Sequence, residues 1–119
     1  MNIRELLSSM TNAQKVRFAL LCALETTDDP EFVRWAGRWL DRTDRTRAAV
    51  HDLVISSILS PYAARAAVQT YIEGNRPEWV DEWAYRAAVW TYADLGHFNL
   101  RGEKIDLPAL ARRAVEGEQ

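Results

Sequence analysis

Helix-start signals recur along the chain and constrain its fold more than any other feature. Asp29-Pro30, Ser60-Pro61 and Asp106-Leu107-Pro108 each place a proline just after a capping residue, at the start of a run with helical apolar spacing. Thr11 and Gln14 have the spacing of a capping box, in which each side chain binds a free backbone amide of the other residue. These starts predict a series of short helices and require no strand.

The apolar spacing between these starts predicts seven helices with short connections. They cover residues 2–9, 12–26, 30–41, 44–59, 61–73, 77–95 and 107–116. Residues 53–59 are rich in β-branched side chains and also suit a strand, but Val50, Leu53 and Val54 fall at helical spacing and favour a helix. Gly74 and Gly96 stand where a left-handed residue can end a helix.

The expected fold is all-α, a compact single-domain bundle of about six to seven short helices that covers residues 1–119. A chain of 119 residues with 48% hydrophobic content can bury one core without metal or disulfides. Alanine-rich segments at 62–67 and 84–88 allow helices to approach closely. The expected core residues share the apolar face of their helices: Val16, Leu20, Leu24, Val50, Leu53, Val54, Ile58 and Val68.

The single cysteine and the apolar run at 18–24 indicate a cytoplasmic protein. Cys22 cannot form an internal disulfide and lies in an apolar helix, where a reduced, inert thiol is expected. The run is only about seven residues long, far below the roughly 20 that span a membrane. With 15 basic and 17 acidic residues, the net charge of −2 excludes a generally basic nucleic-acid coat.

Five tryptophans are the most informative part of the composition, because tryptophan is enriched where proteins bind one another. Trp35 and Trp39 are four residues apart, as are Trp79 and Trp83, and Trp90 follows on nearly the same side as the second pair. Two interpretations stay open: both stripes belong to the core, or at least one lies on a partner surface.

The helix at 77–95 favours the second interpretation, because it has aromatic residues on two sides. Trp79, Trp83 and Trp90 cover one side, and Tyr85 and Tyr92 cover another. A small bundle seldom buries both sides of one helix within a single chain. We therefore expect a homodimer or partner interface on this helix, flanked by three acidic residues that start it. The candidate partner-binding residues here are Trp79, Trp83, Tyr85, Tyr92, Glu78, Asp81 and Glu82.

Arginines recur at about one helical turn from residue 34 to residue 47 and predict an exposed basic ridge. Its members are Arg34, Arg38, Arg42, Arg45 and Arg47. Arg34 and Arg38 are further candidates for partner binding. A ridge beside tryptophan can grip phosphates, which makes a nucleic-acid-associated regulator the alternative function. Asp41 and Asp44 interrupt the ridge, however, and favour the interpretation of a solvated face whose arginines pair with neighbouring acids.

Catalytic chemistry has little support in the sequence. The two histidines, His51 and His97, form no recognisable zinc spacing with Cys22 or with carboxylates. A phosphate-binding glycine loop and a nucleophile elbow are also absent from the sequence. We expect no catalytic residue, no metal and no cofactor.

Four stretches resemble the alanine-rich, all-helical immunity proteins of bacterial polymorphic toxin systems. They are Cys22-Ala23-Leu24-Glu25, Arg34-Trp35-Ala36 with Trp39-Leu40, Ala63 to Val68, and Trp83 to Ala88. The resemblance implies a non-catalytic, stoichiometric inhibitor or adaptor that binds one protein, such as a toxin or a component of a defence system. A phage anti-defence protein would have the same features. The resemblance assigns no role to any single residue.

Two predicted helices begin alike. Pro30-Glu31-Phe32-Val33 and Pro77-Glu78-Trp79-Val80 lie 47 residues apart, and each helix then carries a tryptophan pair. The similarity fades after a few residues. This favours reuse of a good helix start over an internal duplication.

Overall fold

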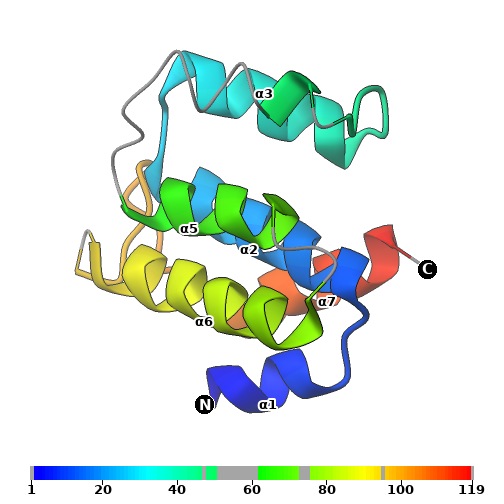
Figure 1. Ribbon diagram of the computed structural model, residues 1–119. Coiled ribbons are helices and arrows are strands. Elements are labelled where there is room, and N and C mark those ends of the chain that lie inside the picture. The colour runs from blue at the N-terminus through cyan, green and yellow to red at the C-terminus, as the bar shows by residue number, and fades with distance from the viewer. Residues whose placement is uncertain (1, 47, 51–61, 73–75, 95, 119) are drawn as a thin grey trace.

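The computed structural model describes residues 2–46, 48–50, 62–72, 76–94 and 96–118. The regular elements in this part of the chain are all helices, joined by turns and loops (Figure 1). Residues 48–50 are helical, and within the described ranges the one β-type pairing is an isolated bridge between Phe98 and Lys104. The predicted all-α fold is confirmed. The labelled helices are α1 (Ile3–Ser8), α2 (Asn12–Thr26), α3 (Pro30–Leu40), α5 (Tyr62–Ile72), α6 (Pro77–Asp94) and α7 (Leu107–Gly117).

The helices begin where the capping residues predicted. Thr11 and Gln14 form the complete capping box at α2. The Gln14 amide donates to the Thr11 hydroxyl at 3.2 Å, and the Thr11 amide donates to the Gln14 side chain at 2.9 Å. The carboxylates of Asp29 and Asp106 accept from backbone amides of α3 and α7. Each satisfies a donor that the helix start leaves without an intrahelical partner. The Ser60-Pro61 start lies outside the described residues, as does Gly74.

The predicted start at residue 44 of the helix at 44–59 is wrong, because the described helical residues of this segment begin at residue 48. Residues 44–46 are not helical, because Asp44 and Thr46 bind the backbone in a competing way. The Asp44 carboxylate accepts from the Thr46 amide at 3.0 Å, and the Thr46 hydroxyl accepts from the Ala49 amide at 3.4 Å. Thr46 thus takes the capping position, and residues 51–59 lie outside the described part of the chain.

Helix α2 lies at the centre of the bundle and packs against α5, α6 and α7. α5 and α6 lie side by side and run antiparallel, as Figure 1 shows, and α1 contacts α6 and α7. α3 lies on the far side of α5 and α2 from α6. The helices that meet here, α5 and α6, bury many small side chains completely: Ala63, Ala64, Ala66, Ala67, Ala84, Ala87 and Ala88.

The core agrees with prediction at the described positions. Val16, Leu20, Val50 and Val68 are buried, and Leu24 is half-buried at the core's edge. Leu53, Val54 and Ile58 lie outside the described residues. The Cys22 thiol is fully buried, and its removal from water raises its pKa well above the ordinary value, which keeps the thiol protonated and unreactive.

Candidate functional site

The buried face of α6 is made of small and medium side chains. Val80, Ala84, Ala87, Ala88 and Thr91 point into the bundle, where they meet α5 and α2. Alanine leaves the two backbones close together, so the seam has no room for an indole ring. The large aromatic residues of α6 therefore lie to either side of this seam.

The tyrosine side of α6 is covered by α1. The Arg4 guanidinium lies 3.9 Å from the centre of the Tyr85 ring and donates to Asp81 at 3.2 Å and to Glu82 at 2.9 Å. Lys15 of α2 forms a second ion pair with Asp81 at 3.3 Å. Four of the candidate residues predicted from sequence therefore serve contacts within the chain. Three of them, Tyr85, Asp81 and Glu82, contact Arg4. The fourth, Tyr92, stacks on His97 with 3.9 Å between ring centres.

The tryptophan side of α6 faces solvent. Trp79 is 44% exposed and Trp90 is 36% exposed, while Trp83 is half-buried. The Arg86 guanidinium lies 4.7 Å from the Trp83 ring and binds Glu82 at 3.2 Å. We call Trp79, Trp83 and Trp90 the Trp stripe. Glu78, in the first turn of α6, is exposed.

The tryptophan pair of α3 has the opposite environment. Trp35 and Trp39 are almost completely buried, and Trp35 meets the edge of the Tyr71 ring of α5 at 6.1 Å between ring centres. Within the described part of the chain, neither indole N–H has a hydrogen-bond partner. The core interpretation is thus confirmed for this pair.

A loop between α6 and α7 presents two further apolar side chains, Phe98 and Leu100, which are exposed. Asn99 between them is buried, and its side-chain oxygen accepts from the amides of Arg101 and Glu103 at 2.9 and 3.0 Å. The loop is therefore held in one shape. Sequence reasoning missed it, although two apolar residues in alternation between Gly96 and Gly102 are a usable signal.

The structure divides the predicted arginine ridge. Arg34 and Arg38 are exposed on α3, whereas Arg42 and Arg45 belong to the turn after α3 and bind Glu118 at the end of α7. Arg42 has a left-handed backbone with φ of 66°, which turns the chain away from the α3 axis. Arg47 lies outside the described residues.

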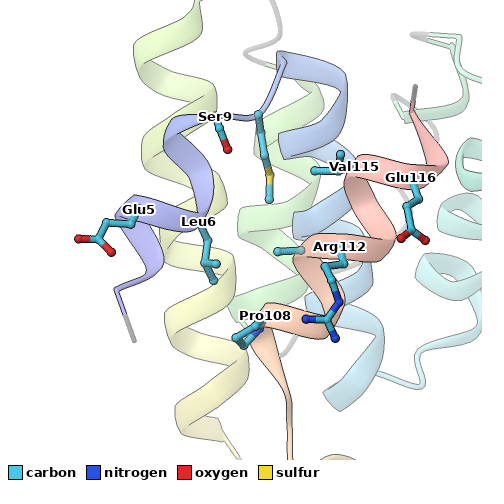
Figure 2. Close-up of a pocket in the computed structure, with 9 residues that line it drawn as sticks. Glu5, Leu6, Ser9, Pro108, Arg112, Val115 and Glu116 are labelled. Atoms are coloured by element: carbon cyan, nitrogen blue, oxygen red, sulfur yellow. The ribbon is translucent and has the colours of Figure 1, made fainter.

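A shallow groove of about 480 Å³ runs between α1 and α7 (Figure 2). Its floor contains Leu6, Met10 and Val115, and charged side chains stand at its edges. In Figure 2, Glu5 points outward from α1, and Arg112 and Glu116 lie along α7. The edges carry both signs of charge and do not select for one kind of charged ligand.

Among the described residues, no group of three His, Cys, Asp or Glu side chains is placed to hold a metal ion; His51 lies outside these residues. None of the described helices is long and apolar enough to cross a membrane. Comparison with protein-family models, with curated proteins and with solved structures finds no match to this chain.

Proposed function

We propose that this protein is a non-catalytic inhibitor or adaptor that binds another protein through the Trp stripe. The observation that carries the proposal is the exposure of Trp79 and Trp90 on an ordered helix whose other two sides are packed. A rigid helix loses little conformational entropy when it binds, so exposed rings on it are suited to anchor an interface.

The chemistry of the stripe supports a protein as the ligand. An indole ring supplies a large apolar area together with an N–H donor, and tryptophan is enriched among the residues that dominate binding energy. Glu78 precedes Trp79 in the chain and is exposed, while Asp81 and Glu82 are already paired with Arg4, Lys15 and Arg86. Apolar contact therefore supplies most of the affinity, and the acidic rim contributes little steering.

The same contacts favour protein binding over the nucleic-acid alternative. Arg42 and Arg45 of the ridge are paired with Glu118, although the Arg42 side chain stays 56% exposed, and Arg34 and Arg38 are exposed on α3. Asp41 and Asp44 lie beside Arg38, and each has its pKa lowered by hydrogen bonds from Thr43 or Thr46 and by this arginine. A surface on which arginines alternate with ionised carboxylates binds phosphate backbones weakly.

The partner is a toxin or a component of a defence system, as the sequence resemblance implies, and a second copy of this chain is the competing occupant of the stripe. A photo-crosslinking phenylalanine analogue in place of Glu78, expressed in the source cells, tests the surface. We expect one discrete adduct, whose mass distinguishes a homodimer from a complex with another protein.

Two matched chains make this test specific. Adding Trp79→Ala to the chain with the analogue should abolish the adduct, because the anchor next to it is gone. The same analogue in place of Val33, which is 41% exposed on the distant α3, should give no adduct. An adduct that persists without Trp79, or equal labelling from position 33, would contradict the proposal.

A further inference from the structure

Three arginines from two distant parts of the chain converge on the carboxylate of Glu118. Arg17 Nε lies 3.2 Å from Glu118 Oε1, and Arg42 Nη2 lies 3.0 Å from Oε2. Arg45 Nη2 also donates to Oε1. The Glu118 side chain is only 5% exposed. We call Arg17, Arg42 and Arg45 the arginine cradle.

The fold holds two of the three guanidiniums of the cradle, those of Arg17 and Arg45, in place independently of Glu118. Arg17 donates to the Leu40 carbonyl at 2.6 Å, and Arg45 donates to the Trp39 carbonyl at 2.8 Å while lying 3.7 Å from the centre of the Trp39 ring. Both carbonyls belong to the last turn of α3, whose final oxygens lack intrahelical donors. Helix α3 therefore preorganises Arg17 and Arg45, and Arg42 completes the cradle from the turn that follows α3.

Gly117 makes room for the cradle. A Cβ atom at this position would lie 2.7 Å from three atoms of the Arg17 guanidinium, so a larger residue would displace the arginine. The Gly117 carbonyl accepts from Arg42 at 3.0 Å. Close approach of backbone and guanidinium is thus a built feature of this end of α7.

The charges at this place need one anion. Three guanidiniums carry three positive charges, and the carbonyl ends of α3 and α7 supply only partial negative charge. Glu118 is the one carboxylate that contacts the cradle among the described residues. Its two oxygens are shared among three arginines, whereas a phosphate offers a separate oxygen to each of them.

We propose that the arginine cradle is an oxyanion-binding site whose built-in occupant is the Glu118 carboxylate, and that it binds phosphate when this carboxylate is absent or withdrawn. Glu118 follows the last helical residue of α7, where helices fray, so it can exchange without unfolding the bundle. Exchange would release the end of α7 from α3.

The lowered pKa of Glu118 agrees with this assignment. Burial alone would raise the pKa, but the hydrogen bonds and charges of Arg45 and Arg17 outweigh it and hold the pKa below its ordinary value. The cradle thus favours a full negative charge over a neutral group.

Vacating the site by Glu118→Ala tests the proposal. Titration of inorganic phosphate at constant ionic strength should raise the Tm of this variant in a saturable way. Phosphate should raise the Tm more than acetate does, since it reaches all three arginines. Adding Arg42→Gln to the same chain should weaken phosphate binding about tenfold, in line with the loss of one hydrogen bond between charged groups.

The matched control is Glu116→Ala, which makes the same charge change at an exposed position of α7. Its Tm should follow only the general stabilisation that phosphate gives folded proteins. Equal responses of the Glu118 and Glu116 variants, or of phosphate and acetate, would overturn the proposal. If Glu118→Ala does not fold, Glu118→Gln keeps the side-chain volume, and phosphorus NMR of added phosphate then reports binding directly; unchanged linewidths would also overturn it.

Discussion

Helices α3 and α6 begin with nearly the same four residues, but α3 buries the third of them and α6 buries the fourth. In α3, Phe32 is fully buried and Val33 is exposed, whereas in α6 Trp79 is exposed and Val80 is fully buried. Successive residues of a helix lie about 100° apart. The two helices therefore have the same local start but are rotated by about one residue relative to the core.

The difference arises from what each helix packs against. α3 lies on the outside of the bundle and turns three large residues inward at helical spacing, with Ala36 buried between them: Phe32, Trp35 and Trp39. α6 shares close seams with α5 and α2, where only alanines and other small residues fit. A tryptophan pair four residues apart is thus buried in α3, whereas in α6 Trp79 is exposed and Trp83 is only partly buried.

The largest expected effect separates the two tryptophan pairs by stability. Trp35→Ala should lower the free energy of unfolding by about 3–5 kcal/mol, because it leaves a cavity in the core. Trp79→Ala should change it by no more than about 0.5 kcal/mol, as expected for a surface position. Urea unfolding followed by far-ultraviolet circular dichroism measures both. Equal losses for the two variants would show that the comparison between the helices is wrong.

Overpacking the buried face of α6 should have the next largest effect on the free energy of unfolding. Ala87→Leu places a larger side chain between α6 and its neighbours and should cost about 1–3 kcal/mol. Ala93→Leu makes the same change at an exposed position of α6 and serves as the control. If both variants unfold at the same urea concentration, close approach of the helices does not decide the rotation of α6.

Lowering the pH should destabilise α3 before α6, because it protonates Glu118. The pKa of this carboxyl in the folded protein is below its ordinary value of 4.5, so its contribution to stability is complete above this pH and is lost as the pH falls through the folded value. At neutral pH, Glu118→Gln should cost about 1–3 kcal/mol, in the range of hydrogen bonds between charged groups. Hydrogen exchange should accelerate in α3 and leave α6 unchanged; uniform acceleration would contradict a local role.

The smallest expected effect concerns the tyrosine side of α6. Arg4→Ala removes the ion pairs with Asp81 and Glu82 and the contact with the Tyr85 ring. Because these groups are partly exposed, the loss should be about 0.2–1 kcal/mol. The chemical shifts of Tyr85 should change while those of Trp79 stay constant. A shift at Trp79 would show that the two sides of α6 are coupled.

The helix starts could be predicted because they depend on neighbouring residues alone. Thr11, Asp29 and Asp106 bind amides within three residues of themselves, and these contacts form in any tertiary surroundings. The all-α fold and the buried Cys22 follow from the same local periodicity. The sequence also indicated that α6 has more aromatic surface than one bundle buries.

Only the tertiary structure decided which side of α6 stays open. Two aromatic sides were equivalent in the sequence, and the position of α1, held by Arg4, distinguished them by covering Tyr85. The arginines were decided in the same way, since Arg42 and Arg45 turn toward Glu118, which is more than 70 residues away along the chain. Local spacing gives the direction of a side chain within its helix, whereas burial depends on which distant segment packs against that side.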